Sequence, residues 1–183
     1  APVLQLLTEE YGLASRLAAI RVGNDNIFLS EKGLFTINQT VDNKLRAVSS
    51  PISFGIDKTF NRINNQYISK AAIGFNDNEL WLAIPWESST VNNKILIYNT
   101  ISQAWFGRYD LPDDDLKIHS FVNVDYYGER RMFFVDKSAR VFLCQEGTHD
   151  IANKKVVDIP FYAKTRSMFY SGIRGKYLTR AYI

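Results

Sequence analysis

Short apolar runs separated by Gly, Asn and Asp dominate the pattern of this chain. In the first such stretch, two polar turns interrupt the apolar runs, one at Gly23-Asn24-Asp25-Asn26 and one at Glu31-Lys32-Gly33. Gly and Asn tolerate the positive φ that tight hairpin turns require. The pattern therefore predicts antiparallel strands near 16–22, 27–30 and 34–37.

The stretch from about 38 to 66 breaks this rhythm and predicts a short amphipathic helix. Ser50 is suited to the N-cap and Pro51 to the first helical position, where its missing N–H costs nothing. Apolar residues then follow at spacings of four, four and three, which places them on one helical face. These residues are Ile52, Ile56, Phe60 and Ile63. We expect a helix near 51–63, weakened by Gly55.

Strands resume at about residue 69 and recur at the short intervals typical of all-β domains. The sequence predicts one β-rich domain over 1–183 with a loose internal repeat, whose period is about that of one four-stranded propeller blade. The predicted fold is all-β, with antiparallel meander repeats in a β-propeller-like arrangement, partial or complete. A β-sandwich shares these strand signals and is the alternative. The blade-like units are predicted at about 12–37, 68–110, 117–146 and 156–183, with a helical insertion at about 50–64.

Composition agrees with this fold and excludes several classes of protein. Of the 183 residues 14% are aromatic, which favours half-buried pleated sheets, and the formal net charge is only +3. Cys144 is the single cysteine, which excludes an internal disulfide framework and a Cys-rich zinc site. The sequence holds no apolar run of the roughly 18–20 residues that span a bilayer. It also holds no basic block as dense as a nucleic-acid footprint. We expect a soluble protein with no membrane span.

Candidate chemistry is sparse, and the sequence predicts neither an enzyme nor a bound cofactor or metal. The common nucleophile, nucleotide-binding and zinc-protease motifs are absent from it. The run Asp113-Asp114-Asp115 offers oxygen ligands but lacks the spacing of a calcium loop, so a solvated loop is preferred. His119 is predicted in a strand and His149 in a surface turn. Cys144 is predicted at a buried strand position.

The predicted contact surfaces are two loops, 86–93 and 110–117, because loops on a rigid scaffold often carry recognition. Trp81 and Trp105 lie in apolar strands and are expected to be packed, whereas Trp86 opens a polar loop and is expected to be exposed. The interaction candidates in these loops are Trp86, Glu87, Asn92, Asn93, Asp113, Asp114 and Asp115.

Two segments, 12–37 and 63–110, carry motifs in a characteristic order. A Gly-Asn-Asp hairpin, a Phe-Leu pair and a Gly precede a Pro-Ile pair. A strand ending in Ile-Pro, an Asn-Asn loop, a strand ending in Tyr-Asn and a Trp then follow. The residues are Gly23, Asn24, Asp25, Phe28, Leu29, Gly33, Pro51, Ile52, Ile84, Pro85, Asn92, Asn93, Tyr98, Asn99 and Trp105. This order resembles β-propeller-type structural proteins of tailed bacteriophages, including tail nozzle and tail-tube-associated proteins.

The resemblance implies a non-enzymatic virion protein, a tail or connector component that acts through protein–protein assembly contacts. It implies other virion proteins as partners, a homo-oligomeric ring, and a place in the phage tail after assembly in the host cytoplasm. DNA would pass through a channel without sequence-specific binding, since phosphate contacts need only basic side chains. The chain ends inside a predicted strand, so we expect a piece of a longer chain. Two alternatives stay open: a cellular kelch- or WD-like interaction module, and a carbohydrate-binding tail propeller.

Overall fold

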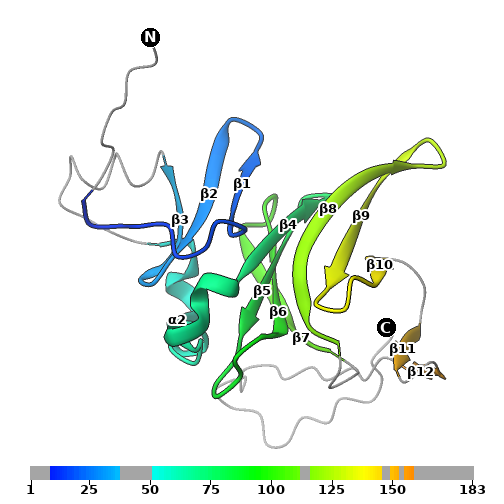
Figure 1. Cartoon of the computed structure of the whole chain (residues 1–183). Helices are drawn as coiled ribbons and strands as arrows, with labels where there is room; N and C mark the ends of the chain where they lie inside the picture. The colour runs from blue at the N-terminus through cyan, green and yellow to red at the C-terminus, as the bar shows by residue number, and fades with distance from the viewer. Residues whose placement is uncertain (1–8, 38–50, 112–115, 146–148, 153–154, 159–183) are drawn as a thin grey trace, which may run out of the picture.

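The computed structural model describes residues 9–37, 51–111, 116–145, 149–152 and 155–158 (Figure 1). Antiparallel strands predominate in these ranges, and the short helical turns among them lie between the first and second groups of strands. The predicted all-β class is therefore confirmed.

The first group of strands, meander 1, consists of β1 (Ala19–Val22), β2 (Asp25–Ser30) and β3 (Gly33–Thr36), hydrogen-bonded in that order. Gly23 has a φ of 60°, which closes the two-residue turn between β1 and β2. The three predicted strands are confirmed. Their boundaries differ by a few residues, because strand pairing begins only at Ala19 and extends to the turn itself.

The second group, meander 2, consists of β4 (Ala72–Asn76), β5 (Glu79–Pro85), β6 (Asn92–Asn99) and β7 (Ala104–Asp110). Each strand pairs with the next one along the chain. The turn between β4 and β5 places Asp77 and Asn78 at φ 47° and 64°, as a type I′ hairpin requires.

The third group, meander 3, consists of β8 (Ile118–Tyr126), β9 (Glu129–Asp136) and β10 (Val141–Leu143). It joins meander 2 through one residue pair, Asn92 with Ile118, while the rest of β6 pairs with β5 and β7. A short hairpin of β11 (His149–Ala152) and β12 (Lys155–Asp158) follows. The prediction of a surface turn at His149 is wrong for the backbone, because β11 begins there.

Helical structure begins after Pro51, as the sequence predicts, but it is broken into short pieces. A 3₁₀-helix η1 (Ile52–Ile56) leads into one turn of α-helix, α2 (Asp57–Phe60), and a second 3₁₀-helix, η2 (Asn65–Lys70), was not predicted. Pro51 is the N-cap of η1 rather than its first helical residue, and Ser50 lies outside the described residues. The predicted apolar face is confirmed, since its four residues belong to or pack on the core.

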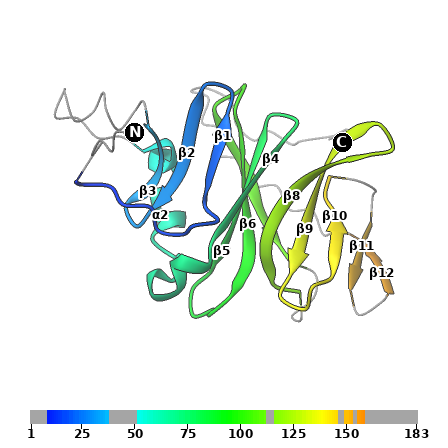
Figure 2. The same cartoon turned by 45° about the horizontal axis from the view of Figure 1, so that its top comes forward.

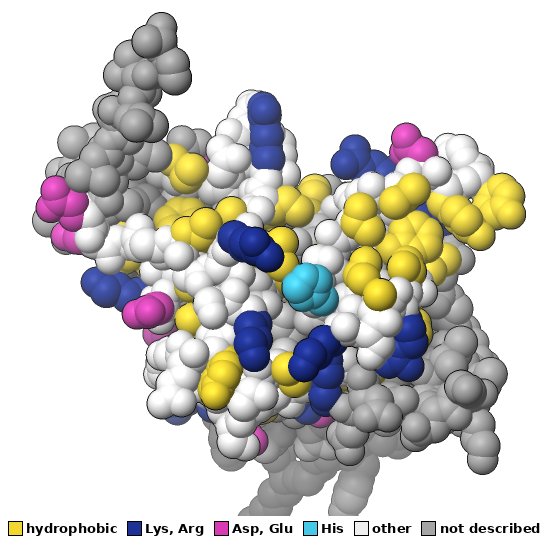
Figure 3. All heavy atoms as spheres, viewed as in Figure 1, with side chains coloured by type: hydrophobic (Ala, Val, Ile, Leu, Met, Phe, Trp, Pro, Cys, Tyr) yellow, Lys and Arg dark blue, Asp and Glu magenta, His cyan; other side chains and the backbone are white. Residues whose placement is uncertain are grey.

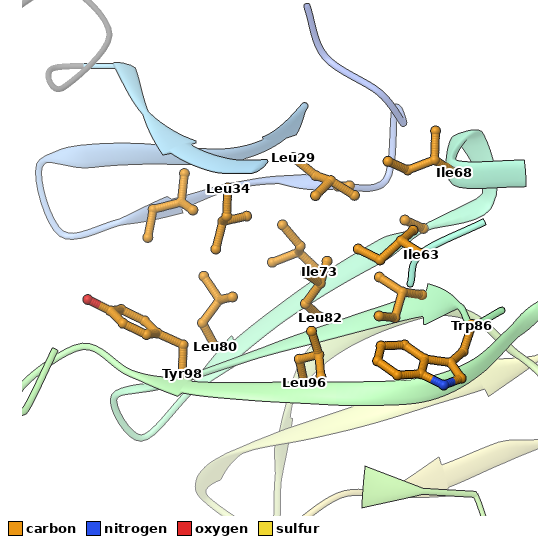
Figure 4. Packing of buried hydrophobic residues seen from close by; sticks show 14 residues of the cluster. Leu29, Leu34, Ile63, Ile68, Ile73, Leu80, Leu82, Trp86, Leu96 and Tyr98 are labelled. Atoms are coloured by element: carbon orange, nitrogen blue, oxygen red, sulfur yellow. The ribbon is translucent and has the colours of Figure 1, made fainter. Parts of the chain in front are cut away.

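Two apolar cores cover the two faces of meander 2. In the first core, Leu29 and Leu34 of meander 1 point toward Leu80 and Leu82 of meander 2 (Figure 4). The second core lies between the opposite face of β5 and β6 and the strands of meander 3. Its buried members are Ala83, Ile95, Leu116, Ile118, Met132, Phe134 and Cys144. Because side chains alternate along a strand, one meander can support a core on each side.

The first strands of the three meanders lie side by side (Figures 1 and 2). Leu17, just before β1, forms a parallel bridge with Ala72 at the start of β4. On the other side, a Cβ at Gly74 of β4 would lie 2.7 Å from atoms of both Phe121 and Met132. The missing side chain therefore lets β4 and meander 3 approach closely.

Stacked meanders with adjacent first strands agree with part of a propeller, and they agree equally with a layered sandwich. The described residues do not close into a ring. The propeller therefore stays a prediction, and the β-sandwich alternative fits.

Candidate functional site

Trp86 is buried, so its predicted exposure is wrong. Only 4% of its surface is accessible, and the Arg62 guanidinium lies 4.7 Å from its ring centroid. The cause is a strand-like pairing that the sequence did not indicate. Ile63 and Trp86 form an antiparallel bridge, and the Asn64 and Glu87 amides donate to the carbonyls of Pro85 and Arg62.

Asn92 also proves to be a structural residue rather than a surface contact, with 2% of its surface exposed. Its Nδ2 donates to the Lys70 carbonyl at 2.6 Å and to the Ile118 carbonyl at 2.9 Å. One amide thus connects η2, β6 and β8. Its burial contradicts the prediction that it lies on a contact surface.

The remaining loop candidates differ in their contacts and exposure. The Oδ1 of Asn93 accepts from the Trp86 backbone amide at 2.9 Å, so it shapes the loop. Glu87 is exposed and pairs with Arg62. Asp113, Asp114 and Asp115 lie outside the described residues. Glu87 is therefore the member of the predicted contact set whose side chain the structure describes as exposed.

The predicted packing of Trp105 and Cys144 is confirmed. Trp105 packs on the first core, and its Nε1 donates to the Ile52 carbonyl at 3.2 Å. Cys144 is 5% exposed, and burial raises the pKa of its thiol to about 12, so it is a poor nucleophile. Across the described ranges, no three His, Cys, Asp or Glu residues are grouped to hold a metal ion.

A basic hollow of about 530 Å³ lies where the first strands of the meanders begin. We call it the strand-entry hollow. Its basic lining residues come from four places: Arg16 before β1, Lys70 before β4, Lys117 before β8, and Lys137 after β9. Figure 3 shows dark-blue basic side chains gathered around a histidine on this face.

The carboxylate of this hollow, Asp136, is already neutralised by its own neighbour. Its Oδ2 accepts from the Arg140 guanidinium, and its Oδ1 accepts from the Ser138 and Arg140 backbone amides at 2.8 Å. Burial opposes ionisation of Asp136, but these hydrogen bonds and the Arg140 charge outweigh it and hold its pKa below the usual range. The hollow therefore keeps a positive character.

Meander 3 exposes an apolar sheet face on the side away from meander 2. On β8, Val122, Val124 and Tyr126 are 43%, 45% and 46% exposed. Register places Phe133 opposite Val122 on this face, and Val141 of β10 adds a further exposed side chain. We call these five residues the open face. Figure 3 shows apolar side chains gathered over the β8–β9 hairpin.

The opposite end of the stack is covered by the chain itself. Tyr11 lies over Phe35 on the outer side of meander 1, with ring centroids 4.4 Å apart. Phe28 packs beside Phe35, which is 1% exposed. The sequence pattern did not distinguish these two ends of the stack, although the segment 118–126 carries apolar residues on both faces of its strand.

Comparison with protein-family models and with curated proteins finds no match to this chain. The resemblance to phage tail proteins therefore still depends on the order of motifs alone. Among the described residues, the helices are all too short or too polar to cross a membrane.

Proposed function

We propose that this chain is a non-enzymatic structural protein of a phage virion, a tail or connector component. It acts by assembly, with copies packed into a ring and in contact with other virion proteins. The observation that carries the assembly role is the open face. The order of sequence motifs described above supports the viral part of the proposal.

The open face supports assembly because apolar side chains cluster on a rigid sheet. Strand β8 alone contributes three neighbouring residues that are more than two-fifths exposed, Val122, Val124 and Tyr126. Clustered exposed apolar side chains are typical of surfaces that bind other proteins. The sheet beneath is fixed by the second core, so the patch is presented without a cost of ordering.

The role as a binding surface is tested with the double variant Val122→Thr/Val124→Thr. Threonine keeps the β-branched shape that suits a strand but adds a hydroxyl to the contact. Light scattering of the full chain over a concentration series measures the oligomer. We expect the ring of the double variant to dissociate at a protein concentration about tenfold or more higher than the wild-type ring does, because the weakened contact comes apart with less dilution.

A matched control is Ile101→Thr, which changes a 75% exposed apolar residue in the β6–β7 turn, away from the open face. This control should assemble like the wild type. A monomeric wild type whose double variant only loses thermal stability would overturn the proposal, because the chain itself would then cover the face.

The virion assignment needs a separate readout. Mass spectrometry of purified particles of the phage that encodes this chain should detect it at a fixed ratio to the other tail proteins. An oligomer that forms in solution but never enters particles would leave a cellular interaction module as the better explanation. The glycan-binding alternative would need an exposed aromatic side chain for a sugar ring to stack on, and Trp86, the tryptophan expected to be exposed, is buried.

A further inference from the structure

The strand-entry hollow gathers basic residues from separate parts of the chain. Arg16, Lys70 and Lys117 each lie within a few residues of the start of the first strand of a meander. The parallel bridge between Leu17 and Ala72 aligns the first two of these starts, and Asn92 connects the second to the third. Three chain segments far apart in sequence therefore bring their charges to one rim.

Most of the basic side chains at this rim have no ion-pair partner in the part of the chain that the structure describes. Among the described residues, no ion pair engages Arg16, Lys117 or Lys137. Lys70 is fixed at the rim, because its Nζ donates to the Thr90 carbonyl at 2.7 Å. The hollow thus offers four cationic groups against the Asp136 carboxylate, which Arg140 already neutralises.

A second, independent feature of the hollow is an unused buried acceptor. Asn92 lines the hollow with 2% of its surface exposed, and its Oδ1 has no hydrogen-bond partner. The orientation of the amide is fixed, because Nδ2 donates to two carbonyls. An unsatisfied buried acceptor is destabilising, and a donor from a ligand would remove that cost.

We propose that the strand-entry hollow binds a small organic phosphate that carries a hydroxyl group. Arg16, Lys117 and Lys137 bind the phosphate oxygens, since charged donors form the strongest hydrogen bonds to phosphate. The Oδ1 of Asn92 accepts from the hydroxyl. The volume of about 530 Å³ suits a small molecule. This binding site is independent of the assembly role of the open face.

Calorimetric titration of the full chain with glycerol 3-phosphate tests the proposal. The variant Arg16→Gln/Lys117→Gln/Lys137→Gln keeps long polar side chains but removes three charges. We expect it to bind at least about tenfold more weakly than the wild type. No detectable binding of glycerol 3-phosphate to the wild type would overturn the proposal.

A charge-matched control separates the hollow from a general effect of net charge. Lys32→Gln/Lys58→Gln/Arg130→Gln removes three charges from residues that do not line the hollow. This control should bind glycerol 3-phosphate as the wild type does. An equal loss in both triple variants would overturn the assignment of the site.

The role of Asn92 is tested by changing the ligand rather than the protein. Methyl phosphate offers the same phosphate monoester without a free hydroxyl, so it should bind about three- to tenfold more weakly than glycerol 3-phosphate. Equal affinities would overturn the hydroxyl contact. A DNA oligonucleotide that binds through the same basic residues but is not displaced by glycerol 3-phosphate would overturn the small-molecule site in favour of a nucleic-acid backbone.

Discussion

Meanders 2 and 3 have similar strands but very different surroundings. Meander 2 has a core on each face, and Leu80, Leu82 and Ala83 of β5 are all 0% exposed. Meander 3 has a core on one face only, and its other side is the open face. The difference shows that an apolar strand alone does not establish which of its faces is covered. The neighbouring meander decides that.

The close packing of meander 2 also depends on small residues. At Gly74 an added Cβ would meet Phe121 and Met132 at 2.7 Å, whereas the open face has room for larger side chains. Protein interiors are close-packed, so a change in side-chain volume lowers stability there, whereas an open surface tolerates it. This contrast between the two meanders leads to three predictions.

The largest effect is expected from a truncation in β5. Leu82→Ala removes a fully buried side chain from the first core and should lower the free energy of unfolding by about 2–5 kcal/mol. The matched change Val122→Ala on the open face should cost less than about 1 kcal/mol. Urea unfolding of both variants measures the difference. Similar costs would mean that the open face is in fact packed.

A smaller effect is expected from the turn that closes meander 3. The folded-state pKa of Asp136 is lowered, so its ionised form stabilises the fold above the unfolded pKa of about 4, and this contribution is lost as the pH falls through the folded pKa. Asp136→Asn should therefore lower stability by about 1–3 kcal/mol near pH 6 and by less near pH 3.

Urea unfolding of the wild type and Asp136→Asn at the two pH values tests this prediction. Asp77→Asn is the control. Asp77 lies in the β4–β5 turn of meander 2, and asparagine, like aspartate, tolerates the positive φ of this position. A difference between Asp136→Asn and the wild type that does not change with pH would contradict the assigned role of the ionised carboxylate.

The mildest perturbation compares how readily the two meanders open. Cys144 follows β10, the edge strand of meander 3, and its buried thiol should react with a thiol reagent only after local opening. In a Cys144→Ala background, Ala83→Cys places a thiol in the centre of meander 2. Labelling should be slower at position 83 than at Cys144. Faster labelling at position 83 would reverse the proposed order of stability.

Much of the fold could be predicted from the sequence because its signals are local. The turns at Gly23-Asn24 and Asp77-Asn78 require positive φ, and Gly and Asn supply it at low cost. The apolar face of 51–63 was likewise correct, because helical spacing is visible in a short window. The division into η1 and α2 was missed, since nothing in the spacing of the apolar residues that pack on the first core marks where one piece ends and the next begins.

The candidate site was predicted less well, because exposure is not a local property. Trp86 begins a polar loop, yet residues 62–64 cover it, and Asn92 is buried because three segments converge on its amide. The basic rim could have been noticed in the sequence as an Arg or Lys before each first strand. Only the stacking of the strands shows that these positions meet.

The sequence by itself determined the all-β class, most strand positions and the hairpin turns of this protein, because each follows from side-chain periodicity and backbone preference over a few residues. The tertiary structure alone decided which faces are covered, where charges converge, and which polar groups are buried. Those properties depend on contacts between residues far apart in the sequence, such as the hydrogen bond from the Ser15 hydroxyl to the Ala71 carbonyl across 56 positions. No pattern over a few neighbouring residues shows which distant parts of the chain will come into contact.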